Sequence, residues 1–148
     1  MNTEDPKSID EAQIRALIDE RLKAVCAKDL NGAIAQVAPN LLSFDVVNPL
    51  QSVGSEAAKR RAEAWFASFQ GAIGQEALDL SITAGEDVAF SHCLNRVTGM
   101  KSDGQKIDMY WRATVCYRKM DGQWIVTHEH NSVPFDPESG RASLDLKP

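Results

Sequence analysis

The sequence predicts an α+β protein in which N-terminal helices pack on a strongly curved, mostly antiparallel sheet. Apolar residues recur at helical spacing in the first half of the chain, whereas β-branched and aromatic runs dominate from Gln75 onward. Asp121-Gly122 joins one such run, Met109–Arg118, to another, Trp124–Val133, and this is the strongest local signal for a β-hairpin. Helices first and long antiparallel strands afterwards are typical of the α+β class.

Length and composition are those of one ordinary globular domain, which we expect to span residues 1–148. The 148 residues suffice for a sizeable core, and 43% of them are hydrophobic. A net charge of −5 argues against nucleic acid and anionic membranes as partners. The acidic start lacks the features of a signal peptide, no run reaches the ~20 apolar residues of a membrane span, and the three cysteines are widely spaced. These features predict a cytoplasmic protein with reduced thiols.

The first helix is predicted from about Ile9 to Lys28, after a loose arm over residues 1–7. Ser8 and Glu11 have the spacing of a capping box. Apolar residues then follow at helical intervals, namely Ile14, Leu17, Ile18, Leu22 and Val25.

Two further helices are expected before the long strands. Asp29 can cap a short helix from Leu30 to Val37, which ends before Pro39. The other helix is predicted from about Glu56 to Gln70, with Gly71 as its stop signal. Its buried stripe comprises Ala58, Ala62, Trp65, Phe66 and Phe69, and the charged residues Lys59, Arg60, Arg61 and Glu63 lie mostly outside it.

Three strands are predicted ahead of the final hairpin, at Leu41–Val47, Ala77–Ala84 and Val88–Thr98. Gly85-Glu86-Asp87 forms the turn between the last two. The tail over residues 136–148 is polar, and we expect it to wrap the surface.

A second hairpin signal, Ser102-Asp103-Gly104-Gln105, leaves the register of its strands open. A two-residue turn at this position places Asn95 opposite Arg112. A three-residue loop places Arg96 there instead, and we prefer the first alternative.

The register of the final hairpin divides its side chains between two faces. With a two-residue turn Met120 pairs with Gln123, and successive side chains alternate. One face is then mostly apolar and comprises Trp111, Ala113, Val115, Tyr117, Trp124, Val126, His128 and His130. The other comprises Arg112, Thr114, Cys116, Ile125, Thr127, Glu129 and Asn131. A one-residue bulge would exchange these sets.

Three stretches together resemble a known superfamily: FDVVNPLQSVG from Phe44 to Gly54, the helix around AEAWFASF, and RATVCYRKMDGQWIVTHEHNSVPF at the end. They are similar to the SnoaL-like, ketosteroid-isomerase-related branch of the nuclear transport factor 2-like superfamily. WIVTHEHNSVP also resembles the association domain of calcium/calmodulin-dependent kinase II. The resemblance covers nearly the whole chain and implies a cone-shaped fold, a pocket between sheet and helices, and dimers formed through the outer sheet face. This fold hosts enzymes, binding modules and assembly domains.

The resemblance also bears on the site. The association domain has pocket arginines on its last two strands, and alignment on the DG-x-W turn places these positions at Thr114 and Asn131. This supports the polar hairpin face as the pocket side, although anion capture by those arginines does not carry over. Ketosteroid isomerase uses a tyrosine and two carboxyl groups. Tyr110 and Tyr117 both lie on a late strand, so we do not expect the same chemistry.

Arg112 and Glu129 are the first candidates for chemistry, because they are diagonal neighbours on the polar face. In one interpretation Arg112 holds a ligand oxygen, assisted by Asn95, Thr114 and Asn131, and Glu129 transfers a proton. In the other the two residues form a structural ion pair.

Asp45 lies within a mostly apolar strand, so it is a second candidate for a general base, or it caps a turn. Trp65 belongs to the core or to the wall of the pocket. Cys116 lacks a facing base and is not expected to be a nucleophile. No metal or cofactor is expected, because the sequence has no Gly-rich phosphate loop and His128 and His130 alone are too few ligands for zinc.

The expected ligand is a small apolar molecule with one polar or anionic group. The first functional hypothesis is an isomerase, dehydratase or cyclase that moves a proton on a carbonyl compound. The alternative is a non-catalytic ligand-binding or assembly domain. The apolar hairpin face is too large to leave in water, so it predicts a homodimer through the outer face of the sheet.

Overall fold

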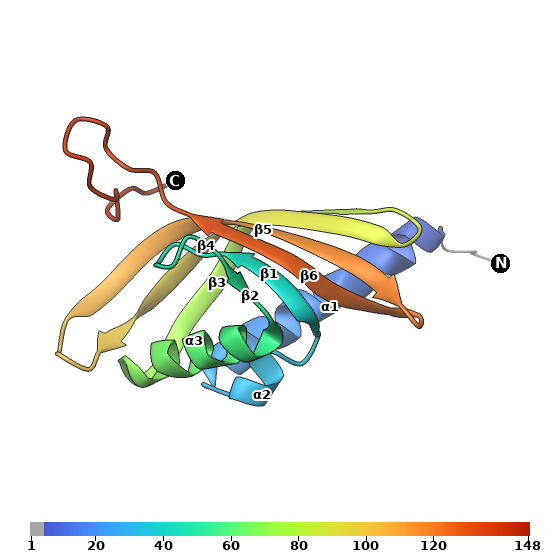
Figure 1. Ribbon diagram of the computed structural model, residues 1–148, viewed down its shortest axis with the longest axis horizontal. Helices are drawn as coiled ribbons and strands as arrows, with labels where there is room; N and C mark the ends of the chain where they lie inside the picture. The colour runs from blue at the N-terminus through green and yellow to red at the C-terminus, as the bar shows by residue number, and fades with distance from the viewer. Residues whose placement is uncertain (1–4) are drawn as a thin grey trace.

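A computed structural model describes residues 5–148 and confirms the predicted α+β class (Figure 1). Three helices, α1 (Pro6–Cys26), α2 (Leu30–Ala33) and α3 (Ser55–Ala67), lie on one side of a curved, open sheet. The six strands are arranged in the order β2-β1-β6-β5-β4-β3, and only β1 and β6 pair in parallel. Their bounds are β1 (Val37–Phe44), β2 (Ser52–Val53), β3 (Phe69–Ala84), β4 (Val88–Lys101), β5 (Lys106–Met120) and β6 (Gln123–Ser132).

Helix α1 begins earlier than the sequence predicts. Asp5 is its N-cap and accepts a hydrogen bond from the backbone N–H of Lys7, while Pro6 occupies the first helical turn. Aspartate at the N-cap followed by proline is a strong start signal, so the helix begins there and the capping box at Ser8 is wrong. Residues 5–7 therefore belong to the capped start of the helix, and the rest of the expected arm, 1–4, lies outside the described residues.

The segment after α1 turns to strand sooner than expected. Helix α2 ends at Ala33, and β1 begins at Val37 and passes through Pro39. Proline has no N–H to donate to a ladder, and Pro39 lies in the stretch where the pairing of β1 with β6 is interrupted. β1 ends at Phe44, so Asp45 lies just beyond the strand.

The end of α3 also differs from the prediction. The helix stops at Ala67, and Phe69 begins β3 by pairing with Lys101. The phenylalanine is still buried, because its ring packs between the helices and the sheet beside Trp65. Hydrophobicity therefore located Phe69 in the core correctly but assigned it to the wrong element.

The β4–β5 hairpin has neither of the predicted registers. Leu94 lies opposite Arg112, and Asn95 lies opposite Trp111. The loop is a turn closed by the Gly104 N–H to the Lys101 carbonyl, and Gly104 has a φ of 88°. A turn followed by a left-handed glycine adds a bulge, which offsets the strands relative to a simple two-residue turn.

The β5–β6 hairpin begins as predicted, with Met120 paired with Gln123 across Asp121-Gly122. Both turn residues have positive φ values, as this tight turn requires. The register then shifts, because Tyr117 pairs with Val126 whereas Cys116 pairs with His128. Thr127 is the extra residue of a β-bulge.

The bulge overturns the predicted division of side chains between faces. Trp111, Val115, Tyr117, Trp124 and Val126 face inward, where they pack on the helices in two core clusters. Beyond the bulge the inward positions of β6 are Glu129 and Asn131, which pair with Val115 and Ala113. The outer face instead presents Arg112, Thr114, Cys116, His128 and His130. The assignment of the apolar face to a partner subunit was therefore wrong.

The C-terminal segment does not wrap the surface. Beyond β6 it projects away from the sheet as a loop, which is closed by a bridge between Phe135 and Ala142 (Figure 1). Phe135 is exposed within it. Among residues 5–148, no helix is long and apolar enough to cross a membrane.

Candidate functional site

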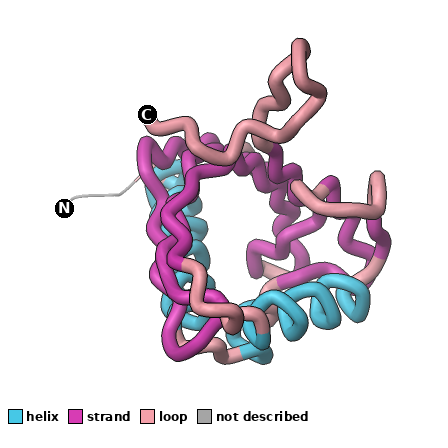
Figure 2. The backbone as a smooth tube through the Cα atoms, turned by 90° about the vertical axis from the view of Figure 1, so that its left-hand side faces the viewer, coloured by secondary structure: helices cyan, strands magenta, loops and turns pink. Residues whose placement is uncertain are grey.

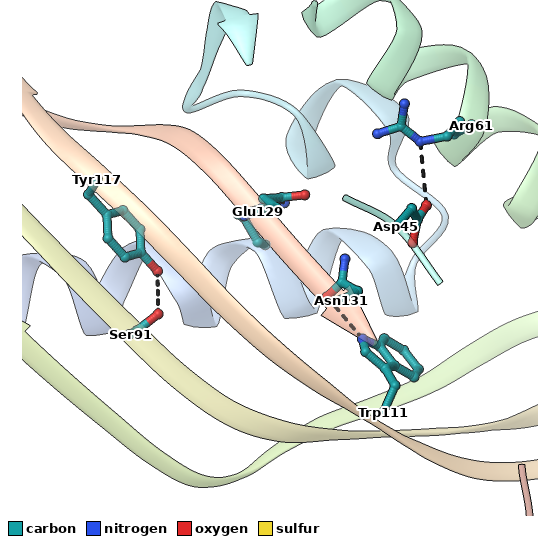
Figure 3. A network of polar contacts seen from close by, with 8 residues as sticks. Asp45, Arg61, Ser91, Trp111, Tyr117, Glu129 and Asn131 are labelled. Atoms are coloured by element: carbon teal, nitrogen blue, oxygen red, sulfur yellow. Dashed lines mark hydrogen bonds and ion pairs between the residues drawn. The ribbon is translucent and has the colours of Figure 1, made fainter. Parts of the chain in front are cut away.

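The backbone of the curved sheet and the helices encircles the interior of the fold (Figure 2), and polar side chains from the end of β1, from β6 and from α3 lie on its inner side. Figure 3 shows the acidic groups of Asp45 and Glu129, the amide of Asn131 and the guanidinium of Arg61 directed toward this space. β1 and β6 bring the acidic groups close together, since Ser43 pairs with Glu129 and Asp45 follows two residues later. We call Ser43, Asp45, Arg61, Glu129 and Asn131, with Arg21 of α1, the inner polar cluster.

Glu129 is held from the helix side by Arg21. A guanidinium nitrogen of Arg21 donates to the carboxylate at 2.5 Å, and the two side chains are 26% and 16% exposed. Burial acts to lower the pKa of Arg21, but the negative charge and hydrogen bond of Glu129 outweigh it and raise the pKa. Arg21 therefore stays charged, and its hydrogen bond fixes the direction in which the Glu129 carboxylate points.

Asp45 is held in a similar way by Arg61 of α3. The Arg61 Nε lies 3.4 Å from the Asp45 carboxylate, and the side chains are 23% and 28% exposed. The other carboxylate oxygen of Asp45 accepts a hydrogen bond from the Val46 backbone N–H at 2.7 Å. Asp45 is thus both a turn-stabilising residue and part of the cluster.

Two buried polar atoms in residues 5–148 have no hydrogen-bond partner, and both belong to the inner polar cluster. They are the Ser43 hydroxyl oxygen and the Arg61 Nη1. Ser43 is only 3% exposed. Buried polar groups are nearly always paired, so two such atoms, one on the ion-pair partner of Asp45 and one on the residue two positions before it, distinguish this part of the interior.

Aromatic side chains close one side of the cluster. The Trp111 indole N–H donates to the amide oxygen of Asn131 at 3.2 Å. This leaves the Asn131 amide nitrogen directed toward Asp45 (Figure 3). Trp65 of α3 packs edge-on against Trp111, with ring centroids 6.3 Å apart. The polar groups therefore lie beside an apolar wall, as in typical small-molecule sites.

Tyr117 lies further along the inner face of β5, beyond Glu129. It is 1% exposed, and its hydroxyl is 2.9 Å from the Ser91 hydroxyl (Figure 3). Burial raises the pKa of Tyr117, although the hydrogen bond to Ser91 opposes part of this increase. Tyr117 is therefore a neutral, already bonded phenol at neutral pH.

A groove of about 740 Å³ runs along α1, between this helix, the segment after α2 and the β5–β6 turn. Its walls include Leu17, Arg21, Gln36 and Trp124. Arg21 therefore borders the groove and also holds Glu129.

Comparison with known proteins identifies the family. The SnoaL-like domain family matches residues 14–136. The chain belongs to the SnoaL-like domain family. It has no significant match among curated proteins.

Solved structures agree with this assignment of a SnoaL-like domain. A nuclear transport factor 2-like protein of unknown function from Pseudomonas putida KT2440 is 38% identical, with 95% of this chain and 98% of that chain covered and a TM-score of 0.87. A ketosteroid isomerase-like protein from Erwinia carotovora atroseptica SCRI1043 is 18% identical. The match covers 83% of this chain and 95% of that chain, with a TM-score of 0.71. The association domain of C. elegans calcium/calmodulin-dependent kinase II is 16% identical. The match covers 88% of this chain and 100% of that chain, with a TM-score of 0.67. The last two show the shared fold alone.

In this SnoaL-like domain the predicted site residues separate into two groups. Asp45, Glu129 and Asn131 lie together in the inner polar cluster, and Trp65 and Asn95 also lie on the inner side. Their roles in binding or catalysis stay predictions.

Arg112 and Thr114 are on the opposite, outer face and are exposed, so they cannot line the interior. Arg112 donates to the Ser132 hydroxyl at 3.1 Å, and the predicted pairing of Arg112 with Glu129 is wrong. The bulge at Thr127 is the cause, because it turned Glu129 inward while Arg112 stayed outside.

Sequence reasoning missed Arg21, Arg61 and Ser43. Arg21 lies three residues after Ile18, within the apolar stripe of α1. Arg61, which was predicted to lie mostly outside the stripe of α3, comes three residues after Ala58 and is within it. A charged residue in an apolar stripe was the available signal. Ser43 gave a weaker signal, since it shares a strand face with Asp45.

Proposed function

We propose that this SnoaL-like domain is an enzyme that moves a proton on an apolar carbonyl compound, as an isomerase, dehydratase or cyclase. The observation that supports this proposal is the pair of carboxylates inside the fold, Asp45 and Glu129, each held by its own arginine. A carboxylate that is oriented but still partly accessible suits a general base.

In this mechanism one carboxylate removes the proton from the carbon next to the carbonyl group, and the electron pair of that C–H bond forms an enolate. Return of the proton to another carbon completes an isomerisation, whereas loss of a hydroxyl group as water from the adjacent carbon completes a dehydration. Attack of the enolate carbon on a second carbonyl group of the same molecule closes a ring, and the resulting alkoxide takes back the proton held by the carboxyl group. Asn131 orients the substrate with its free amide nitrogen, and Trp65 and Trp111 hold its apolar part.

Glu129 is the preferred base. Its carboxylate is the less exposed of the two and is fixed by Arg21 on one side only. Asp45 is restrained on both sides, by Arg61 and by the Val46 backbone N–H. Reorientation toward a substrate therefore breaks fewer contacts for Glu129, and Asp45 serves as the second carboxylate that returns the proton.

Proton transfer can be tested without knowing the natural substrate. The exchange of α-protons with solvent deuterium is followed by NMR for a panel of neutral ketones, with 2-tetralone as the first member. Glu129→Gln is expected to slow the enzyme-dependent exchange by about 10²-fold or more, and Asp45→Asn to slow it less.

Matched controls come from the outer face, where Arg96 pairs with Glu76 and Asp108. Glu76→Gln and Asp108→Asn make the same chemical changes away from the inner polar cluster and are expected to leave exchange unchanged. Exchange that equals the uncatalysed rate with every ketone, or that survives both inner substitutions, would overturn the proposal.

The second candidate function is ligand binding or assembly without catalysis, and the outer sheet face favours it. Phe44 makes edge contacts with His128 and His130, at centroid distances of 4.8 and 5.4 Å, and Phe90 stacks on His92. Phe90 is 44% exposed. An exposed aromatic strip on a sheet suits a second copy of the chain, so we propose a homodimer through this face.

A further inference from the structure

The inner polar cluster contains hydrogen-bonding capacity that the protein itself does not use. The Ser43 hydroxyl and the Arg61 Nη1 are both buried and unpartnered. Both groups belong to neighbours of Asp45, because Ser43 precedes it by two residues near the end of β1 and Arg61 is its ion-pair partner. Each unpaired group costs stability, and alanine at position 43 would remove that cost without adding volume. Two unused donors on neighbours of the same carboxylate therefore point to a ligand atom that accepts from both.

The charges of the cluster restrict what that ligand can be. Arg21 is paired with Glu129, and Arg61 is paired with Asp45, so two positive groups face two negative groups. The cluster has no surplus positive charge with which to attract an anion. A carboxylate ligand would also lie beside two carboxylates, and like charges at short range repel strongly in a partly buried site.

We infer that the Ser43 hydroxyl and the Arg61 Nη1 donate hydrogen bonds to the carbonyl oxygen of a neutral ketone or ester. This inference rests on the proposed function and deepens it, because it names the class of substrate and the groups that hold its oxygen. As the base removes the neighbouring proton, negative charge develops on that oxygen. Donors that are already in place stabilise this charge without reorganisation.

Entry of the ligand requires a local movement, because both donor atoms are shielded from water in the free protein. Arg61 is still 23% exposed as a whole side chain and projects from α3 at the edge of the cluster. Rotation of this side chain brings Nη1 to the arriving oxygen while Nε keeps its contact with Asp45. The positions of Ser43 and Glu129 on paired strands place the oxygen donor and the base side by side.

The test uses three probes that share one apolar body: 2-acetylnaphthalene, which is a neutral ketone, 2-naphthoate, which is an anion, and 2-ethylnaphthalene, which has no oxygen. Affinities are measured by calorimetry. The carbonyl stretch of ¹³C-labelled 2-acetylnaphthalene is measured by infrared difference spectroscopy, because donated hydrogen bonds lower its frequency. The wild-type protein is expected to bind the ketone about tenfold or more tightly than either other probe, with a lowered carbonyl frequency.

Ser43→Ala and Arg61→Lys are the test variants. Each is expected to weaken ketone binding about threefold to tenfold, since one hydrogen bond is lost, and to return the carbonyl frequency toward its value in an apolar solvent. Ser43→Ala is also expected to raise the melting temperature, because it removes an unpaired buried hydroxyl. A stability gain combined with a binding loss distinguishes a ligand-binding serine from a structural one.

Matched controls are Ser91→Ala, which truncates an equally buried serine that already has a partner, and Arg60→Lys on the exposed side of α3. Both are expected to leave the carbonyl frequency unchanged. Equal or tighter binding of 2-naphthoate would overturn the inference, as would a carbonyl frequency insensitive to Ser43→Ala and Arg61→Lys. A lowered frequency without α-proton exchange would retain this binding role and reject the proposed catalysis alone.

Discussion

Arg21 and Glu129 are 108 residues apart in the chain, yet they form an ion pair that joins α1 to β6 inside the fold. Loss of one partner leaves the other as an uncompensated charge in a mostly buried position. The pair is therefore both a structural link and the support of the candidate base.

The first prediction concerns this link. Arg21→Leu is expected to lower the free energy of unfolding by about 1–3 kcal/mol, because Glu129 is then desolvated without a partner. The double variant Arg21→Leu/Glu129→Leu is expected to recover most of that loss. Urea unfolding measures both.

Arg96→Leu is the control for Arg21→Leu, because Arg96 also pairs with carboxylates but on the outer face. Its loss is expected to change the free energy of unfolding much less than Arg21→Leu does, because solvent screens the exposed ion pairs. Equal effects of Arg21→Leu and Arg96→Leu would mean that burial does not strengthen the inner pair.

The second prediction concerns Asp10, which anchors the start of α1 to the β5–β6 hairpin. Its carboxylate lies 2.7 Å from the Lys119 ammonium and accepts from the Trp124 indole N–H at 3.1 Å. The hydrogen bond from Lys119 lowers the pKa of Asp10, while burial opposes this decrease. A carboxyl group with a lowered pKa in the folded state stabilises the protein above its unfolded pKa of about 4, and this contribution disappears as the pH falls through the folded pKa.

Asp10→Asn is therefore expected to destabilise the protein at pH 7, by about 1 kcal/mol for one charge-assisted hydrogen bond. The difference from the wild type should shrink as the pH falls below about 4. Denaturant unfolding at pH 7, 5 and 3 measures it, and Asp19→Asn on the exposed side of α1 is the control. A difference that stayed constant across this range would show that the charge of Asp10 is not the source of its effect.

The third prediction concerns the outer face and the proposed homodimer. Phe90→Glu places a carboxylate in the exposed aromatic strip and is expected to shift the protein to monomers at micromolar concentration, as measured by analytical ultracentrifugation. Leu50→Glu makes a similar change at a fully exposed residue of the β1–β2 loop, away from this face. A wild-type protein that sediments only as a monomer would remove the proposed dimer, and unchanged sedimentation of Phe90→Glu would place its interface elsewhere.

Local patterns were sufficient to predict the class of the fold, the order of the long elements and the tip of the last hairpin. Asp121-Gly122 specified its turn because both residues tolerate positive φ, and the pairing of Met120 with Gln123 followed directly. The resemblance to SnoaL-like proteins rested on segments that keep these local signals, and the family was confirmed.

The composition of the site was less accessible to sequence reasoning, because it depends on contacts between distant residues. Glu129 and Asp45 were identified by their unusual polarity within strands, but their arginine partners come from α1 and α3. The local pattern indicates that Arg21 interrupts an apolar stripe, but it does not indicate which carboxylate pairs with Arg21. Arg112 was chosen instead because strand alternation, counted without the bulge, placed it on the same face as Glu129.

The extra residue at Thr127 has a consequence for how this protein is compared with its relatives. Counting from the hairpin turn gives equivalent positions only as far as Val126, so an alignment without a gap at Thr127 would equate inward residues with outward ones. Deleting the codon for Thr127 would remove the bulge and leave Glu129 and Asn131 inward, whereas a regular strand that kept Thr127 would bring His128 and His130 to the inner surface instead. Loss of the bulge without loss of the residue is thus an evolutionary route by which homologues can exchange carboxylate chemistry for imidazole chemistry on one scaffold.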